Sequence, residues 1–488
     1  MPSSLHPAKT YTLPLLDPLL QKTMQKDKRY LETTRIPIIT VSASYVEDLK
    51  GLHHLPEKDI AQDVVLSRAH YSMALAVAVQ AWQKKIDPSQ AWIVDPTNYV
   101  TAKDWSRVIF TETVGKVLAR VSPLKKMKDL LDRFGRNQLP ILSSISAPLL
   151  YLTQDIVRPI LSMHIASGNI LAAQGKTVVQ MITDPHVRAD YLNEAERKNM
   201  FFLVFDQQTK TDFIEKAELL NKKVDQNRVI VTGPPVDPRV VQNVQFKQVW
   251  QDSTDHPKPL RLCFTTGGLG TNKNEIKELL KQLLPKLNKT PQSYQLLIYA
   301  GTHLDFVKMV RQLTDKHNLA LNQITCHDPA SFGIRAKLVT PAIIQKFKKS
   351  LEKAPVSIIY HPQVVDANEL LTHLAFPWAD GFISKPSGDM AYDAVMSGSF
   401  LLTLQEWGEW EHNIRQLFTN LGVAKQAETD DIVEQLEQLK KTNSSGKSWI
   451  TQAMSQTKQL EPLFYQGTKN IVENIEKIGL LNQPKQLK

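Results

Sequence analysis

The sequence is poor in cysteine, because its 488 residues include only Cys263 and Cys326. Two thiols cannot build a disulfide framework, so the composition fits a reducing compartment better than a disulfide-stabilised secreted scaffold. No segment reaches the roughly 20 apolar residues that cross a bilayer. The closest segment, 137–154, carries no charge but is interrupted by Pro140 and Pro148. We therefore expect a cytoplasmic protein, at most peripheral at the inner face of a membrane.

Common nucleotide and metal motifs are also missing. The loop Thr266-Gly-Gly-Leu-Gly-Thr271 is neither Gly-x-Gly-x-x-Gly nor a P-loop, which disfavours a dinucleotide or a triphosphate. No Asp-x-Asp motif suited to a catalytic metal is evident, so we expect no metal and no cofactor. The net charge of +10 permits anionic partners but does not identify one. Because the net charge is the only feature that supports nucleic-acid binding, we do not expect a nucleic-acid partner.

Strand-like and helix-like segments alternate along the chain, which is typical of layered α/β domains. Helices are expected over 64–83 and 274–284, and 447–478 should be mostly helical with a break near Pro462. The predicted strands are 36–42, 91–95, 177–183, 200–205 and 228–232 in the first half, and 260–265, 295–300, 356–360, 381–384 and 400–404 in the second.

These segments predict two layered α/β domains. The expected N-terminal domain spans 1–239, with a helical and membrane-facing insertion near 104–170. The polar stretch 240–259 is the expected linker. The expected C-terminal domain spans 260–446, and helices in 447–488 should pack back on the domains.

Two small-residue turns follow predicted strands of the second half. Gly267 and Gly268 follow one strand, and Ser387 and Gly388 follow another, so both turns should lie at the carboxyl edge of one sheet, where ligands bind. Backbone N–H groups in such turns can hold a diphosphate. Asp393, about one and a half turns into the following helix, could accept hydrogen bonds from ribose hydroxyls. A tight strand-to-helix turn is the alternative interpretation of the glycine loop.

The run from Thr265 to Lys425 resembles the C-terminal half of two-Rossmann-domain (GT-B) glycosyltransferases, most closely the MurG and monogalactosyldiacylglycerol-synthase group (family 28). The shared motifs, in order, are Gly267-Gly-Leu-Gly270, the block from Ala379 to Gly398, and Glu411-His-Asn413. The resemblance implies two Rossmann-like domains that face each other across a cleft. It also implies a UDP-sugar donor, with a nucleotide-sugar-binding C-terminal domain and an acceptor-binding N-terminal domain. It assigns the diphosphate to Gly267, Gly268, Gly270, Thr271, Ser387 and Gly388, the ribose and base to Asp393, His361 and Val365, and the sugar to Glu411 and Asn413.

The first half carries a weaker form of the same resemblance. Ser67-Arg-Ala-His70 looks like the remnant of a glycine-rich loop that ends in a histidine, which makes His70 the candidate catalytic base. Thr183-Asp-Pro-His186 resembles a Thr-Asp segment of the glycolipid-forming members, so Asp184 is an acceptor contact or a second base. The alternatives are a partly buried helix histidine and an ordinary Asp-Pro turn.

The chain departs from the family at several of these positions. Ser67-Arg68-Ala69 lacks the glycines, Asp393 replaces a glutamate, and Asp389-Met390 replaces a Leu-Thr pair and adds a negative charge beside the phosphate site. The resemblance implies metal-independent transfer of a hexose-type sugar from a nucleotide diphosphate to a lipid or saccharide acceptor. A sugar-nucleotide epimerase of GT-B shape and a non-catalytic nucleotide-sugar-binding relative remain the alternatives.

The segment 116–136 is rich in Lys and Arg with apolar residues between them. A basic amphipathic helix of this kind can rest on an anionic membrane surface. Such a charge run is more often a solvated helix face, and the family's use of lipid-linked acceptors raises the expectation of membrane association.

Overall fold

The fold was analysed in a computed structural model of the chain. The structure describes residues 17–46, 49, 63–83, 85–120, 140–244, 247–250, 258–287, 293–325, 349, 351, 354–444 and 446–481. Most of the basic segment 116–136, the N-terminal residues 1–16 and Cys326 lie outside these ranges, and Cys263 is buried.

The first half is built on a six-stranded sheet in which all neighbouring strands are parallel. Its strands are short and mostly buried, as expected of a parallel sheet covered on both faces. The strand order is β4-β1-β5-β6-β7-β8. The bounds are β1 Ile36–Ile39, β4 Ala91–Val94, β5 Ile160–Ser162, β6 Val178–Met181, β7 Met200–Val204 and β8 Val229–Val231.

The second half is built on a seven-stranded sheet, also parallel throughout, with the order β11-β12-β10-β9-β13-β14-β15. The bounds are β9 Leu260–Thr265, β10 Tyr294–Gly301, β11 Leu321–Ile324, β12 Val356–Tyr360, β13 Gly381–Ser384, β14 Phe400–Thr403 and β15 Ala424–Gln426. A two-stranded antiparallel ribbon, β2 Ala43–Ser44 with β3 Val64–Val65, extends from the first half. The α/β class with two parallel-sheet domains, predicted from the sequence, is confirmed.

Each sheet has a topological switch point at its first strand. In the first sheet β1 lies between β4 and β5, and in the second β9 lies between β10 and β13. In open parallel sheets ligands bind at such switch points, outside the carboxyl ends of the strands. The loops after β9 and β13 are the two small-residue turns noted in the sequence, so they lie together at the switch point of the second sheet.

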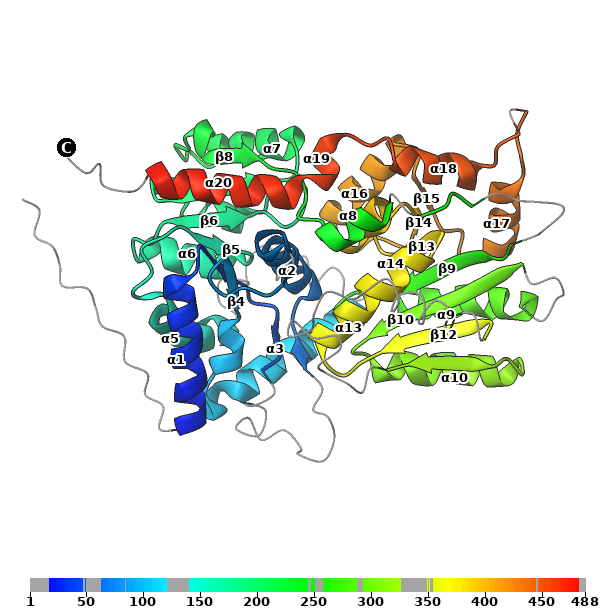
Figure 1. Cartoon of the computed structure of the whole chain (residues 1–488), viewed down its shortest axis with the longest axis horizontal. Coiled ribbons are helices and arrows are strands. Elements are labelled where there is room, and N and C mark those ends of the chain that lie inside the picture. Colours follow the sequence, from blue (N-terminus) through cyan, green and yellow to red (C-terminus); the bar gives the residue numbers. More distant parts are fainter. Residues whose placement is uncertain are drawn as a thin grey trace, which may run out of the picture.

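Helices cover both sheets, and Figure 1 shows the two halves side by side with α20 lying back along the first half. In the first half they are α1 Pro18–Thr33, α2 Arg68–Trp82, α3 Ala102–Arg120, α5 Pro140–Thr153, α6 Ile165–Ala173 and α7 Gln207–Leu219. The remaining helices are α8 Pro238–Val244, α9 Lys273–Leu283, α10 Leu304–Lys316, α13 Val364–Leu370, α14 Phe376–Trp378, α15 Met390–Met396, α16 Glu409–Asn420, α17 Ile432–Lys440, α18 Trp449–Thr457, α19 Pro462–Tyr465 and α20 Gly467–Leu481.

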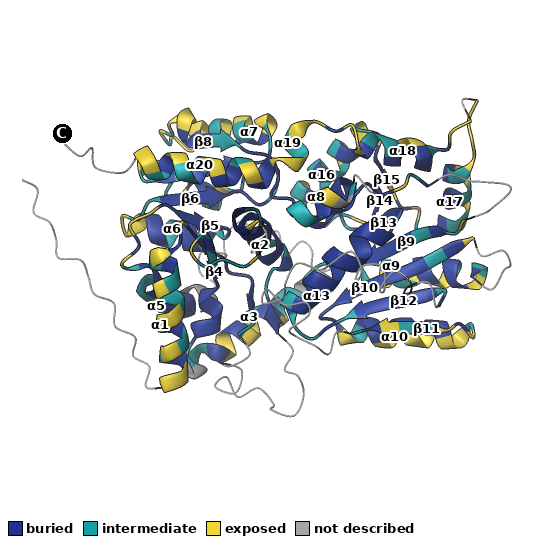
Figure 2. Ribbon diagram, in the orientation of Figure 1, coloured by how far each residue is buried: buried dark blue, intermediate teal, exposed yellow. Residues whose placement is uncertain are grey.

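The helix α2 is buried on nearly all sides (Figure 2). Its sequence is rich in alanine and valine without a polar stripe, which is typical of a helix enclosed by protein. It packs against β1 and β4, and also against α8 and α20. The prediction of a helix over 64–83 was wrong at its start, because Val64 and Val65 form β3 and Ser67 caps the helix by accepting from His70 N.

Two further expectations concern the apolar segments. The uncharged stretch near 137–154 contains α5, which has Pro148 inside it and packs against α1 and α3. Among the described residues no helix is both long and apolar enough to span a bilayer. The expected helical insertion near 104–170 overlooked β5, a central strand of the first sheet.

Candidate functional site

The side chain of His70 lies at the switch point of the first sheet. Its Nδ1 is 3.4 Å from the carbonyl oxygen of Val41, just after β1, and its ring is 5.3 Å from that of His164, just after β5. Its Nε2 is 3.4 Å from Thr183 Oγ1, beside Asp184. Loops after three neighbouring strands therefore hold His70 at the carboxyl edge of the sheet.

The glycine loop after β9 meets the start of α2. A Cβ placed on Gly268 would lie 2.8 Å from the backbone nitrogen of Arg68, so only glycine allows this approach. A Cβ on Gly267 would lie 2.8 Å from Cε of Lys385, which follows β13. Gly270 has a φ of 69°, a left-handed conformation that glycine adopts without strain. The loop is thus enclosed by both halves of the chain.

The Ser387-Gly388 turn meets the Thr183-Asp184 segment of the first half. A Cβ on Gly388 would lie 2.4 Å from the carbonyl oxygen of Thr183 and 2.6 Å from Asp184 Oδ1. The helix after this turn, α15, begins only at Met390 and has seven residues. Asp393 therefore lies in its first turn, and the prediction that it lies one and a half turns in was wrong.

Asp184 is a partly buried carboxyl at the interface of the two halves. Burial is the largest cause that raises its pKa, to about 6, and the nearby Glu411 and Asp389 also raise it. Arg188 and Lys385 act in the opposite direction. A carboxyl with a pKa in this range can exchange protons near neutral pH, which is a common property of catalytic groups.

The two predicted sugar contacts on α16 lie close to the same place. Glu411 is fully buried and accepts from Lys385 Nζ at 2.6 Å and from the backbone N–H of Trp407 at 2.7 Å. Asn413 Nδ2 donates to the carbonyl oxygen of Pro185 at 3.0 Å. Asn413 therefore contacts the segment that carries Asp184, whereas Glu411 is engaged by a lysine.

Asp393 faces the connection between the two halves. It accepts from the backbone N–H of Asp237 at 3.4 Å. Burial, together with the charges of Asp389 and Asp237, raises its pKa well above the ordinary value. A carboxyl group in this place can accept hydrogen bonds from ribose hydroxyls.

The loop predicted to contact the base, His361 to Asp366, is bound by the first half. Asp63 Oδ2 accepts from Val364 N at 2.7 Å, and Asp63 N donates to the carbonyl oxygen of Pro362 at 3.0 Å. His361 is buried, and its Nδ1 accepts from Gln363 N at 3.1 Å. Val365, the other predicted base contact, packs against the core.

The structure thus brings His70, Asp184, the two small-residue turns and α16 to one interface. It also reveals a residue that sequence reasoning left out of the site. Arg68 forms a buried ion pair with Asp389 across this interface, and the only sequence signal was a charged residue where the family has glycines.

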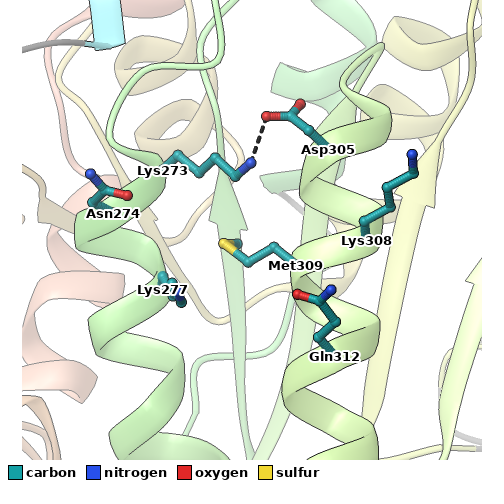
Figure 3. Close-up of a pocket in the computed structure, with 7 residues that line it drawn as sticks. All are labelled: Lys273, Asn274, Lys277, Asp305, Lys308, Met309 and Gln312. Carbon is teal, nitrogen blue, oxygen red and sulfur yellow. Dashed lines mark hydrogen bonds and ion pairs between the residues drawn. The ribbon is translucent and has the colours of Figure 1, made fainter.

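A surface groove of about 360 Å³ lies between α9 and α10 (Figure 3). Lys273 in this groove pairs with Asp305 at 2.6 Å. None of the residues predicted for the site lines the groove, whose lining is Lys273, Asn274, Lys277, Asp305, Lys308, Met309 and Gln312.

Two parallel-sheet domains in contact at their switch points define a protein of the GT-B architecture. The chain belongs to the family described as "Domain of unknown function (DUF6938)", which matches residues 224–476, just over half of its length. No curated protein matches the chain significantly.

Several solved structures are similar to this chain over most of its length at low sequence identity. A trehalose 6-phosphate synthase from Burkholderia multivorans is 11% identical with a TM-score of 0.49, covering 92% of this chain and 99% of its own. UDP-GlcNAc 2-epimerase from Neisseria meningitidis is 12% identical with a TM-score of 0.44, covering 91% and 99%. MurG from Acinetobacter baumannii is 12% identical with a TM-score of 0.43, covering 91% and 99%.

Proposed function

We propose that this protein is a glycosyltransferase that moves a hexose-type sugar from a nucleotide diphosphate, preferably a UDP-sugar, to a hydroxyl group of a lipid or saccharide acceptor. One observation carries the proposal. His70 contacts Thr183 in the first half, and Thr183 and Asp184 contact the Gly388 turn of the second half, near the Lys385–Glu411 pair and at the carboxyl edges of two parallel sheets. The order of motifs in the second half supports a place near the MurG and monogalactosyldiacylglycerol-synthase group.

We propose a separate binding role for each of the two domains. Residues 1–239 bind the acceptor, 260–446 bind the donor, 240–259 connect them, and 447–488 pack back on both. The donor residues proposed are Gly267, Gly268, Gly270, Thr271, Ser387 and Gly388 for the diphosphate, Asp393, His361 and Val365 for ribose and base, and Glu411 and Asn413 for the sugar. Because the halves are in direct contact at these loops, donor binding requires them to move apart and then close, which excludes water from the reacting groups.

The chemistry assigned to the site needs one base and one stabilised leaving group. An acceptor oxygen attacks the anomeric carbon of the sugar, and its proton passes to the imidazole of His70. The bond from that carbon to the diphosphate breaks, and the electron pair stays on the diphosphate oxygen. Backbone N–H groups of the glycine loop and the cation Lys385 then stabilise the leaving diphosphate. Asp184, whose pKa is about 6, is ionised at neutral pH and holds an acceptor or sugar hydroxyl.

An apolar surface beside the site favours a lipid acceptor over a soluble saccharide. On α3 the side chains of Ile109, Phe110 and Val117 are 39%, 61% and 47% exposed. The same helix reaches the donor loop, because a Cβ on Gly115 would lie 3.8 Å from the side chain of Leu269. We propose that this surface contacts the acyl chain of the acceptor or an anionic membrane at the cytoplasmic face.

Nucleotide binding tests the proposed site. A ligand that binds only the folded protein stabilises it by about 2.7 kcal/mol at about 100 times its Kd. UDP is expected to raise the Tm by several degrees, and uridine, which lacks the diphosphate, is expected to raise it much less.

A matched control separates this site from general anion binding. Lys308→Gln removes a lysine from the groove between α9 and α10 and should leave the UDP shift intact. A shift that disappears in this variant, or no shift with any nucleotide diphosphate, would argue against the proposed site.

A further inference from the structure

Arg68, the first residue of α2, reaches from the first half into the second. Its Nη2 donates to Asp389 Oδ2, and its Nη1 donates to Asn368 Oδ1 at 3.3 Å. Ser72 Oγ donates to the same oxygen of Asp389 at 3.0 Å. The side chains of Arg68 and Asp389 are 6% and 2% exposed. A buried ion pair therefore joins the halves beside the glycine loop.

Three buried donor atoms around this loop have no hydrogen-bond partner within the described part of the chain. They are Arg68 Nε, Tyr299 Oη and Thr271 Oγ1. Arg68 and Tyr299 line a small cavity of about 10 Å³ together with Gly267 and Gly268. Thr271 Oγ1 lies 3.1 Å from the position of a Cβ on Gly267. Buried donors are nearly always paired, so three unpaired donors at one loop indicate a place for a group rich in acceptor atoms.

A second cation lies on the other side of the loop. Lys385 approaches Gly267, and its Nζ is paired with Glu411 at 2.6 Å. Both cations that flank the loop are thus paired with carboxylates of the second half. Asp389 also accepts from Ser387 Oγ at 2.9 Å, so its carboxylate contacts both Arg68 and the Ser387-Gly388 turn.

We propose that Arg68, Tyr299 and Thr271 form an anion subsite for the diphosphate, and that Asp389 is a built-in competitor that holds Arg68 until a diphosphate replaces it. This inference rests on the proposed function, because it concerns the donor of the same site. A diphosphate carries more negative charge and more acceptor oxygens than one carboxylate, and a guanidinium binds phosphate through two parallel hydrogen bonds.

The exchange also links donor binding to the contact between the halves. The ion pair of Arg68 with Asp389 is part of that contact, so a diphosphate that takes Arg68 removes one connection and adds a bridge of its own. Donor binding thereby replaces the Arg68–Asp389 ion pair with a bridge from Arg68 through the diphosphate to the second half.

Calorimetric titration of the full chain with UDP, inorganic pyrophosphate and uridine tests the exchange. Asp389→Asn removes the competitor, and we expect it to bind UDP and pyrophosphate about tenfold more tightly. Arg68→Met removes the guanidinium and should bind both at least about tenfold more weakly. Uridine affinity should stay the same, because uridine does not reach Arg68. In Arg68→Met/Asp389→Asn the gain should vanish, since the competitor acts only through Arg68.

The control variant is Glu369→Gln, which weakens a different buried ion pair at the connection, with Arg239. This variant should bind pyrophosphate, UDP and uridine as the wild type does. Circular dichroism and the Tm of each variant establish that it is folded.

The outcomes separate this inference from the proposed function. UDP that binds equally well to the wild type, Asp389→Asn and Arg68→Met would overturn the subsite and leave the function standing. The predicted pyrophosphate pattern without sugar turnover would support the subsite and count against the transferase. Absence of UDP and pyrophosphate binding in every variant would overturn both.

Discussion

Replacing His70 with alanine is expected to lower kcat for sugar transfer by about 10²- to 10⁴-fold, the range that loss of a general base produces. The acceptor hydroxyl would then have to lose its proton to water as it attacks. Steady-state kinetics with a saturating UDP-sugar donor measures the effect. Donor affinity should change little, because His70 lies at the switch point of the first sheet, whereas the loops proposed to bind the donor belong to the second.

His164→Asn is the matched control for this prediction. His164 is the other histidine at the switch point, and its side chain caps α6 by accepting from Ala166 N, a role that asparagine can fill. We expect near-normal turnover in this variant. Normal turnover in His70→Ala would show that His70 is not the base and would direct attention to Asp184.

Glu369→Ala is expected to lower the free energy of unfolding by about 1–3 kcal/mol, because the buried guanidinium of Arg239 loses one of its two carboxylate partners and two charge-assisted hydrogen bonds. Glu369 Oε2 accepts from Arg239 Nη1 at 2.7 Å and Oε1 from Nη2 at 3.0 Å, and His373 Nε2 is 3.1 Å from Oε2. Arg239 lies on α8 in the connection between the halves and also pairs with Asp237. Urea denaturation at neutral pH measures the loss.

The pH dependence of the free energy of unfolding gives a second test of the Glu369 ion pair. Burial raises the pKa of Glu369, but the charge of Arg239 outweighs it and holds the pKa at about 2, below the ordinary 4.5. A lowered folded-state pKa means that the stabilisation is complete above about pH 4.5 and is lost as the pH falls toward 2. Glu369→Gln should lack this part of the acid dependence. A Glu369→Ala protein that is as stable as the wild type would contradict the assignment.

Much of the fold could be predicted, because buried parallel strands are short apolar runs bounded by turns. The strands predicted at 260–265, 356–360 and 381–384 match the structure residue for residue, and the break at Pro462 is the start of α19. The strand β5 was missed because it has only three residues, Ile160–Ser162, too few to show a period.

The placement of the site residues depended on contacts that no local pattern contains. Arg68 and Asp389 are 321 positions apart in the chain, and each looked like a departure from the family when considered alone. Only the packing of α2 onto the second half shows that the two departures meet. The ion pair of Glu411 with Lys385 and the hydrogen bond from Asp237 N to Asp393 likewise depend on tertiary structure.

Acceptor-dependent release of UDP from a UDP-sugar tests the central claim most directly. The purified chain is incubated with UDP-glucose, UDP-galactose or UDP-N-acetylglucosamine, with and without lipid vesicles that carry a diacylglycerol or polyprenyl acceptor. A transferase releases UDP only when an acceptor is present, and His70→Ala abolishes most of that release. Conversion of the UDP-sugar into its epimer without an acceptor, or tight UDP binding with no turnover across the panel, would contradict the assignment as a glycosyltransferase.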